Sequence, residues 1–386
     1  MKRILFVELN EDGTVGGSHG ILFDLVTRLP SDFEPVVLFY EDNPWVGRLR
    51  GEGIEVHVWD ARRREESTSL AGSRWNTAKA MGGLIAYRRA FIRDADIDMV
   101  HLNNSPFQGW DDWLLAARWA GVPCVVYAMG DAHREPSAVK RWFMRQFDRV
   151  FPLSRLVMHS LIDNEIPAER MVLTYPGLDL EALSVRPYRP RDEVRDELGV
   201  EPGQVLAVMV GNVRRWKGQH VVVEGVGGLS SEQRARLVLL LVGDIGPLHG
   251  DYADELRARI AELGIGDTVR FTGRREDVPD LLEAADVAIH ASIMPEPFGL
   301  VVLEGLTHGC AVVAAGAGGP VEMIDEKAGL LYDPAKPAEL TERLARLLDD
   351  PEGRARLGAA ARVRARDFDI RDHVRLIVET YRELLD

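Results

Sequence analysis

Residues 287–314 read VAIHASIMPEPFGLVVLEGLTHGCAVVA, and this stretch decides the class of fold. It begins and ends with a short apolar run of the kind that forms a buried strand. Pro295 and Pro297 fix the backbone between the two runs and exclude a helix before Gly299, where we expect a helix to begin. The order of strand, loop, helix and strand is typical of a parallel sheet that helices cover.

The same alternation extends to both sides of this stretch. Helical segments, for example 110–120, 252–263 and 338–348, lie between most of the short apolar runs. Two such sets in series predict two doubly wound, Rossmann-like α/β domains, in which ligands bind beyond the carboxyl ends of the strands. The expected strands are residues 4–9, 36–40, 54–58, 99–102, 124–127 and 150–153 in the first half, and 205–210, 237–242, 269–272, 287–290 and 311–314 in the second.

The boundary between the domains is expected within residues 183–199, which carry two prolines and many charges but few large apolar side chains. We therefore predict an N-terminal domain over 1–185 and a C-terminal domain over 186–368, followed by a C-terminal helix over 369–386 that is expected to cross back to the N-terminal domain. Residues 62–74 are polar and are expected to form a surface loop.

Composition limits the class of function. The chain has 386 residues and a formal net charge of −14, which argues against a nucleic-acid binder because a polyanion would be repelled. No stretch reaches the ~18 apolar residues that span a bilayer, so we expect a cytoplasmic protein. Cys124 and Cys310 lie in apolar runs and are expected to be buried, reduced thiols. A catalytic thiol is the alternative, but no base stands next to either cysteine.

The first loop of interest, GTVGGSH over residues 13–19, follows the first expected strand. Gly16 and Gly17 would let the backbone approach a ligand closely, and the next helix would offer free N–H groups. An ordinary tight turn explains the two glycines equally well, so this loop alone does not decide a function.

A second loop, GNVRRWKG over residues 211–218, follows the first strand of the second half. Arg214, Arg215 and Lys217 place three cations within four residues, and at the carboxyl end of a strand they would neutralise a diphosphate. The alternative is a solvated turn whose charges have no ligand.

The third loop contains two carboxylates. The helix expected from Gly299 has first N–H groups, near Leu300 and Val301, that lack partners within the helix and favour an anion. Glu296 lies just before this helix, and Glu304 lies on its first turns among apolar residues. A carboxylate in such a place must be paired or bound to hydroxyl groups, either those of a sugar or polar groups of the backbone.

With these residues assembled, a resemblance is clear. Glu296 and Glu304 match the E-x7-E motif of retaining nucleotide-sugar glycosyltransferases, and the chain resembles glycosyltransferase family 4, which has the GT-B fold. The second half matches in order over about 200 residues. The first half matches more loosely. The matching segments are 242–247, 269–274, 285–287 and 318–322 in the second half, and Gly16-Gly17 and 98–101 in the first.

The resemblance implies roles for individual residues. Lys217 resembles the lysine that binds the diphosphate, Glu304 the carboxylate that binds ribose, and Glu296 the group that contacts hydroxyls of the donor sugar. The implied donor site also contains Gly16, Gly17, Gly211, Gly273, Arg274, Phe298, Gly299, Leu300 and Val301, and the implied acceptor side contains His101, Asn103, Met129 and Asp131.

Three positions depart from the family pattern. Asn212 stands where the family has an arginine, and either Arg214 or Arg215 would have to replace it. Met129 stands where the family often has a histidine, and Pro176 replaces the usual asparagine before a glycine. The histidine difference bears most directly on the acceptor side.

The resemblance further implies transfer from a UDP- or GDP-sugar with retention of configuration, in polysaccharide, glycolipid or glycoconjugate synthesis. The cations would replace a metal ion, no cofactor is expected besides the nucleotide-sugar co-substrate, and the D-x-D sequences are expected to be solvated turns. Glu296 as a covalent nucleophile is a lesser alternative. An epimerase or a phosphorylase on the same architecture, or an inactive nucleotide-sugar-binding module, would also be compatible with this fold.

We expect the acceptor to be a sugar, a small molecule or a lipid-linked molecule. Residues 140–147, KRWFMRQF, are basic and aromatic at helical spacing. They would either lie on the inner face of a membrane or pack Trp142 and Phe143 on the sheet as an ordinary amphipathic helix.

Overall fold

The computed structural model describes residues 1–9, 16–59, 74–104, 112–130, 138–246 and 249–386. The chain forms two compact units, which are described separately. The first contains Met1–Pro176 and Ile370–Asp386, and the second contains Gly177–Asp369. The division therefore falls nine residues before the expected boundary at residue 185, and the C-terminal helix belongs to the first unit. Most of the expected loop over residues 62–74 lies outside the described residues.

The sheet of the first unit has the strand order β3-β2-β1-β4-β5-β6, and every neighbouring pair is parallel. This order is typical of a doubly wound, Rossmann-like domain. Residues 4–7 of the first strand are fully buried, which explains their continuous apolar run. The strands are β1 (Lys2–Glu8), β2 (Phe33–Phe39), β3 (Glu55–Val58), β4 (Met99–Asn103), β5 (Cys124–Ala128) and β6 (Arg149–Pro152).

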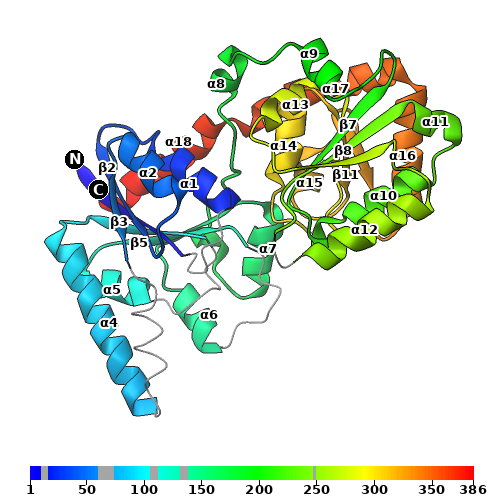
Figure 1. Ribbon diagram of the computed structural model, residues 1–386. Helices are drawn as coiled ribbons and strands as arrows, with labels where there is room; N and C mark the ends of the chain where they lie inside the picture. The colour runs from blue at the N-terminus through cyan, green and yellow to red at the C-terminus, as the bar shows by residue number, and fades with distance from the viewer. Residues whose placement is uncertain (10–15, 60–73, 105–111, 131–137, 247–248) are drawn as a thin grey trace. The chain divides into compact units, whose positions relative to one another are not determined.

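Helices cover this sheet, and the last helix of the chain is one of them. Helix α18 (Ile370–Leu385, red in Figure 1) buries Val374, Ile377 and Tyr381, which recur at helical spacing. The ring of Tyr381 packs 5.8 Å from that of Phe33 in β2. The other helices of this unit are α1 (Gly17–Val26), α2 (Pro44–Gly51), α4 (Arg74–Asp94), α5 (Asp112–Ala120), α6 (Ala138–Met144), α7 (Arg155–Asp163) and η1 (Ala168–Arg170).

The sheet of the second unit has the order β12-β11-β10-β7-β8-β9 and is also parallel throughout. Its last strand, β12 (Gly329–Tyr332), was not expected from the sequence because it begins with glycine, a residue that is depleted in strands. That glycine is needed, since a Cβ atom at Gly329 would lie 2.9 Å from the carbonyl oxygen of Val312. The other strands are β7 (Val205–Val210), β8 (Leu237–Val242), β9 (Val269–Gly273), β10 (Val287–His290) and β11 (Ala311–Ala315).

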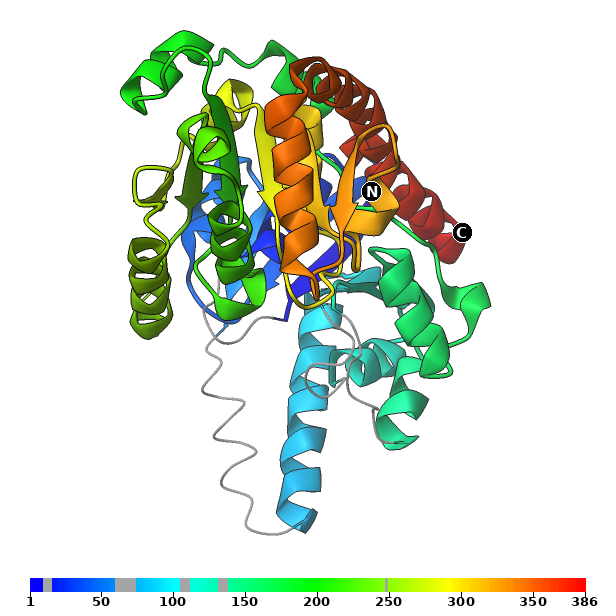
Figure 2. The same ribbon diagram turned by 90° about the vertical axis from the view of Figure 1, so that its right-hand side faces the viewer.

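Helices cover both faces of the second sheet; α16 (Pro337–Asp349, orange in Figure 2) lies against β11 and β12. The expected linker over residues 183–199 is wrong in part, because it contains α9 (Arg191–Glu197) with Val194 buried. The remaining helices are α8 (Leu180–Val185), η2 (Arg215–Lys217), α10 (Gln219–Gly227), α11 (Ser231–Ala235), α12 (Gly250–Glu262), α13 (Val278–Ala284), α14 (Leu300–Thr307), α15 (Pro320–Met323), α17 (Pro351–Ala365) and η3 (Arg366–Phe368).

Two neighbouring strands bring the second and third loops together. Strands β7 and β10 are hydrogen-bonded neighbours in the second sheet. The loop over residues 211–218 follows β7, and the loop that leads to α14 follows β10. Because the carboxyl ends of parallel strands meet at the same edge of a sheet, these two loops lie side by side within one unit.

Candidate functional site

The loop after β7 is fixed against the loop after β10 by a close backbone approach. Gly218 has a φ of +78°, and a Cβ atom there would lie 1.8 Å from the carbonyl oxygen of Ala291. Ile293 donates its backbone N–H to the carbonyl of Trp216 at 2.9 Å. Only glycine permits this contact at residue 218, so the glycine that ends the loop positions the lysine directly before it.

Lys217 and Glu296 meet at this junction. Nζ of Lys217 lies 2.8 Å from Oε1 of Glu296. The second carboxylate oxygen, Oε2, accepts hydrogen bonds from Nε2 of His290 and Oγ of Ser292, each at 2.7 Å. Three donors, from the loop after β7, the end of β10 and the loop after it, thus hold one carboxylate, whose side chain is 15% exposed.

These donors determine the charge of Glu296. Burial opposes ionisation, but the hydrogen bond from His290 and the charge of Lys217 outweigh it and hold the pKa of Glu296 well below its ordinary value. Because a carboxylate only accepts hydrogen bonds, the proton of the His290 ring lies on Nε2. Nδ1 of that ring is buried and has no hydrogen-bond partner among the described residues.

The backbone of Glu296 is held by the loop after β11. The N–H of Gly319 donates to the carbonyl of Glu296 at 2.8 Å. Cβ atoms at Gly318 and Gly319 would lie 2.3 Å from the Glu296 carbonyl oxygen and 2.2 Å from the Phe298 carbonyl oxygen, respectively. The two glycines that precede Pro320 therefore bring this loop into backbone contact with the loop that carries Glu296.

Helix α14 begins where the sequence predicted. Gly299 is its N-cap with a φ of +94°, no side chain caps the helix, and its first turn contains no acidic residue. The N–H groups of Leu300 and Val301 have no partner within the helix, and no side chain of the described residues accepts from them. This end of α14 carries the partial positive charge that favours an anion.

Glu304 lies one turn further along α14. Its side chain is half-buried, and no hydrogen bond or ion pair reaches it from the described part of the chain. Burial raises its pKa to about 7. A carboxyl group in this state is satisfied by hydroxyl groups, which donate to its ionised form and accept from its protonated form.

The structure separates the two arginines that the sequence left as alternatives. Arg215 pairs with Glu255, and its guanidinium carbon lies 4.8 Å from the centre of the Tyr252 ring. Arg214 instead donates to two backbone carbonyls, those of Val213 at 2.9 Å and Ile245 at 2.6 Å. Its positive charge has no acidic partner among the described residues.

The remaining expected donor residues of this unit occupy strand ends. Gly211 directly follows β7, and its N–H donates to the Val242 carbonyl at 2.8 Å. Gly273 ends β9 with a φ of +69°, and Arg274 after it is exposed. Phe298 is buried, with its ring 6.0 Å from that of Phe368. Sequence reasoning missed His290 and Ser292, although both lie within six residues of Glu296.

In the first unit, Gly16 is the exposed N-cap of α1, Gly17 is the first residue of that helix, and a Cβ atom at Gly16 would meet open space. Residues 10–15 of the same loop lie outside the described residues. The sequence therefore correctly placed a helix start at this point, whereas no close approach requires glycine at residue 16 within the described structure.

The expected acceptor-side residues do not share one environment. Asn103 is fully buried and donates to Oε2 of Glu8. Met129 follows β5 and is 9% exposed, and Asp131 lies outside the described residues. These positions keep Asn103 and Met129 near the carboxyl ends of neighbouring strands, as the sequence indicated.

His101 corrects the expectation that it faces a ligand. It is fully buried among Phe6, Phe151 and Tyr381, and its Nδ1 is hydrogen-bonded to the hydroxyl of Tyr381 in α18. Burial, with His373 nearby, lowers its pKa to about 3. His101 is therefore a neutral core residue. Side chains alternate between the two faces of a strand, and that of His101 points to the face of the sheet that α18 covers.

The described residues contain neither a cluster of metal-binding side chains nor a membrane-spanning helix. No group of three or more histidine, cysteine, aspartate or glutamate side chains comes together there as a metal site. The D-x-D sequences stand at residues 94–96, 96–98 and 367–369, and two of their aspartates, Asp98 and Asp367, pair with Lys2 and Arg364. No helix of this part of the chain is long and apolar enough to cross a bilayer.

Comparisons with known proteins agree with this geometry. Residues 190–364 match the family described as "Glycosyl transferases group 1", and residues 16–177 match "Glycosyl transferase 4-like domain". A D-inositol 3-phosphate glycosyltransferase of Corynebacterium efficiens is 30% identical over 92% of this chain and 84% of its own length. A D-inositol 3-phosphate glycosyltransferase of Saccharomonospora viridis is also 30% identical, over 77% of this chain and 72% of its own length.

Solved structures show the same fold. The crystal structure of Alr3699/HepE from Anabaena in complex with UDP has a TM-score of 0.81 at 24% identity, over the whole of both chains. That of a glycosyltransferase from Rickettsia africae has a TM-score of 0.85 at 19% identity, over 100% of this chain and 99% of the other. With two parallel sheets and the E-x7-E carboxylates just before and on α14, the chain belongs to the group 1 glycosyltransferases, of the family 4 type with the GT-B fold.

Proposed function

We propose that this glycosyltransferase moves a sugar from a nucleoside diphosphate sugar to a hydroxyl group of its acceptor, with retention of configuration and without a metal ion. The observation that carries the proposal is the meeting of Lys217 and Glu296 at 2.8 Å, directly before the uncapped start of α14. At the edge of one sheet, the cation and the helix N-terminus suit the diphosphate of a nucleoside diphosphate sugar. The two carboxylates suit the hydroxyl groups of its ribose and its sugar.

The leaving diphosphate would be stabilised by Lys217, Arg214 and the free N–H groups of Leu300 and Val301. As the bond between the anomeric carbon and the diphosphate breaks, negative charge grows on the leaving oxygen. Preorganised donors aimed at such charge typically each contribute ~2.7–4 kcal/mol. We favour Arg214 over Arg215 as the replacement for the family arginine, because Glu255 already neutralises Arg215.

Glu304 would bind the ribose hydroxyls. With a pKa raised to about 7 by burial, its carboxyl group is short of partners in the free protein. A ribose diol supplies two hydroxyl groups that can donate to the carboxylate, and their hydrogen bonds would offset its desolvation. Gly273 and Arg274 are proposed to border the base, and Gly16 and Gly17 to approach the phosphates.

Glu296 would position the donor sugar rather than attack it. Its two oxygens offer about four lone-pair positions, and Lys217, His290 and Ser292 occupy three of them. The remaining position suits one sugar hydroxyl. A carboxylate whose charge is shared among three donors is a weak nucleophile, which argues against a covalent intermediate on this residue.

The transfer step then needs only the substrates and these donors. The bond from the anomeric carbon to the diphosphate oxygen breaks, and the acceptor oxygen bonds to the same carbon from the same face. The acceptor proton passes to the leaving phosphate oxygen, so atoms and charge balance without a protein base. Closure around the donor would exclude water, which otherwise competes as an acceptor.

The comparisons support one donor and one acceptor class as the first to test. Crystal structures of Anabaena Alr3699/HepE are described in complex with UDP and with UDP-glucose. Several relatives are named D-inositol 3-phosphate glycosyltransferases. We therefore propose a UDP-sugar over a GDP-sugar as the donor, and a polyol phosphate such as D-inositol 3-phosphate as the acceptor.

A lipid-linked acceptor at a membrane surface is favoured by one observation. Trp142 in α6 is 53% exposed rather than packed on the sheet, and its ring lies 5.0 Å from that of the half-buried Phe143. Co-sedimentation with anionic vesicles tests this second candidate. Binding that is lost in Trp142→Ala but kept in Trp119→Ala, which changes another exposed tryptophan of this unit, would support it, and no binding would end it.

The main proposal is tested by thermal shift and product release. UDP and UDP-glucose should raise the melting temperature of the chain, and Glu304→Ala and Lys217→Ala should remove the shift. Incubation with UDP-glucose and D-inositol 3-phosphate should release free UDP. Epimerisation without UDP release would favour an epimerase, and donor binding without turnover across acceptors would favour an inactive binding module.

A further inference from the structure

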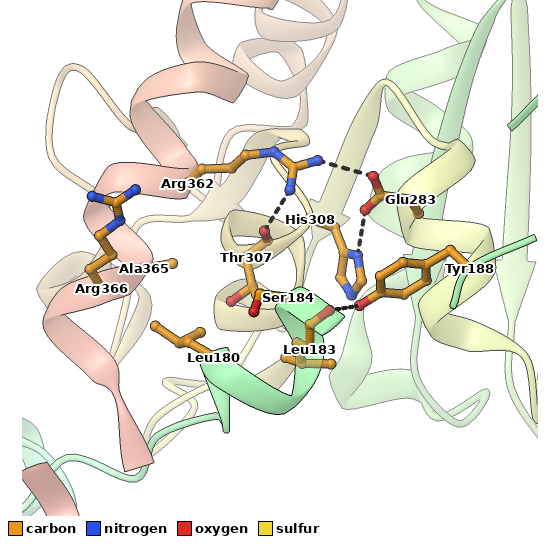
Figure 3. Close-up of a pocket in the computed structure, with 10 residues that line it drawn as sticks. All are labelled: Leu180, Leu183, Ser184, Tyr188, Glu283, Thr307, His308, Arg362, Ala365 and Arg366. Atoms are coloured by element: carbon orange, nitrogen blue, oxygen red, sulfur yellow. Dashed lines mark hydrogen bonds and ion pairs between the residues drawn. The ribbon is translucent and has the colours of Figure 1, made fainter. Parts of the chain in front are cut away.

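A pocket of about 360 Å³ lies at the C-terminal end of α14, the opposite end from Gly299. Five parts of the second unit line it: α8, the segment after α8 that carries Tyr188, α13, the end of α14, and the junction of α17 with η3 (Figure 3). None of its lining residues belongs to the proposed donor or acceptor site. Its volume falls near the lower end of the range for small-molecule pockets.

His308 points an unused acceptor into this pocket. The residue is 6% exposed, and its Nδ1 lies 3.0 Å from Oε2 of Glu283. Because the carboxylate can only accept, Nδ1 carries the proton, and burial lowers the pKa of His308 so that the ring is neutral although Glu283 opposes this. Nε2 is therefore a lone-pair acceptor, and Figure 3 shows it turned toward the space beside Leu183 and Tyr188.

No described residue donates to this nitrogen. The ring of Tyr188 meets His308 edge-on at 5.3 Å, but the Tyr188 hydroxyl donates to the carbonyl of Leu183 at 3.0 Å. This acceptor, which opens into the pocket, can therefore take a hydrogen bond from a hydroxyl or N–H group of a ligand.

The pocket also carries one unbalanced positive charge. Arg362 is used within the protein: it lies 3.2 Å from Oε1 of Glu283 and donates to the carbonyl of Thr307 at 3.3 Å. Arg362 and Glu283 thus compensate each other. Arg366 also lines the pocket, is exposed, and has no acidic partner among the described residues. Leu180, Leu183 and Ala365 supply apolar surface between these polar groups (Figure 3).

We infer that this pocket binds a small hydroxylated anion, whose hydroxyl group donates to Nε2 of His308 and whose anionic group pairs with Arg366. A carboxylate and a phosphate ester share this chemistry. The apolar surface next to Leu180 and Leu183 suits the short carbon chain that would join the hydroxyl and the anionic group.

The surroundings suggest what such a ligand would do. The backbone N–H of His308 donates to the carbonyl of Glu304 at 3.1 Å, so the pocket adjoins the helix that carries the proposed ribose carboxylate. Helix α8 closely follows Pro176, and η3 closely precedes Ile370, the two points where the chain passes between the units. Leu178 donates to the carbonyl of Phe368 at 3.2 Å and joins these two segments. A ligand here would therefore act as an effector of turnover rather than as a donor or acceptor.

Calorimetric titration of the whole chain at constant ionic strength tests the inference. D-glycerate and glycerol 3-phosphate carry both required groups, glycerol lacks the charge, and propionate lacks the hydroxyl. We expect at least one of the first two to bind and the last two to bind at least about threefold more weakly, as expected for losing one exposed ion pair or one hydrogen bond. Preference between glycerate and glycerol 3-phosphate distinguishes a carboxylate from a phosphate ester.

Substitutions of residues that line the pocket test whether the anion binds there. Arg366→Gln and His308→Phe should each weaken it by about threefold or more. Arg356→Gln is the matched control, because Arg356 lies on the same helix α17, is 69% exposed and does not line the pocket. Ser184→Trp, an exposed position at the rim, should block binding without disturbing the His308 hydrogen bond.

The outcome is independent of the proposed transfer. Lys217→Ala should keep full affinity for the anion, even though it removes the proposed donor site. Absence of binding for both hydroxylated anions, or unchanged affinity in Arg366→Gln and Ser184→Trp, would overturn the inference and leave the donor site untouched.

Discussion

Nζ of Lys217 and Oε1 of Glu296 lie 2.8 Å apart, although the two residues are 79 positions apart in the sequence. The contact exists because β7 and β10 are neighbours in the sheet and because Gly218 lets one loop approach the other. It joins the proposed phosphate-binding cation to the proposed sugar-binding carboxylate. The first predictions concern this pair.

Lys217→Ala should lower kcat with UDP-glucose by about 10²–10³, because it removes one preorganised donor from the leaving diphosphate. Steady-state kinetics with UDP release as the readout measures this. Lys336→Ala is the control, since Lys336 is 64% exposed and, within the described structure, pairs with Asp333 and Glu339 alone. A Lys217→Ala enzyme that keeps wild-type kcat would show that the lysine does not act on the diphosphate.

His290→Phe should raise the pKa of Glu296, because the hydrogen bond from His290 makes the largest contribution that lowers this pKa against the effect of burial. The lowered pKa keeps the carboxylate ionised and stabilises the fold above the ordinary pKa of glutamate, and this stabilisation is lost as pH falls through the folded-state pKa. The acid limb of kcat/KM should therefore move to higher pH. His290→Gln, which keeps a donor, should restore most of the profile, whereas equal profiles for all three enzymes would contradict the role of the ring.

Glu304→Gln should make the fold more stable than that of the wild type, and this difference in unfolding free energy should grow as pH rises. The folded-state pKa of Glu304, about 7, lies above the ordinary value of 4.5, so its contribution is fully present below pH 4.5 and is lost as pH rises to 7. The variant should gain about 2–3 kcal/mol in unfolding free energy relative to the wild type between these limits. Chemical denaturation at pH 4.5 and 7.5 measures the difference, and the same variant should bind UDP more weakly. A constant stability difference across this range would contradict the burial of the carboxyl group.

Tyr381→Phe should destabilise the first unit by about 1–3 kcal/mol, because it leaves Nδ1 of the fully buried His101 without its partner. Thermal unfolding followed by circular dichroism would show this as a lower melting temperature. Tyr87→Phe provides the comparison, since Tyr87 is 53% exposed and should tolerate loss of its hydroxyl. If Tyr381→Phe melted with the wild type, the contact between α18 and β4 would not hold the unit together.

Periodicity and proline placement were enough to predict most of the fold. Eleven of the twelve strands in the described part of the chain were predicted from short apolar runs, because strands buried in a parallel sheet have no alternating polar face. The start of α14 at Leu300 follows from Pro295, Pro297 and Gly299. The exceptions have local causes: β12 begins with glycine, and α9 is a charged helix that buries only Val194.

The sequence by itself determined the fold class, the family motif and the residue types of the donor site, because these depend on spacing along the chain. Only the tertiary structure decided which groups are paired: it placed Glu255 against Arg215, His290 and Ser292 against Glu296, and Tyr381 against His101. The reason is physical. The charge and pKa of a side chain depend on burial and on neighbours that folding brings from distant segments, and a linear pattern does not contain those distances.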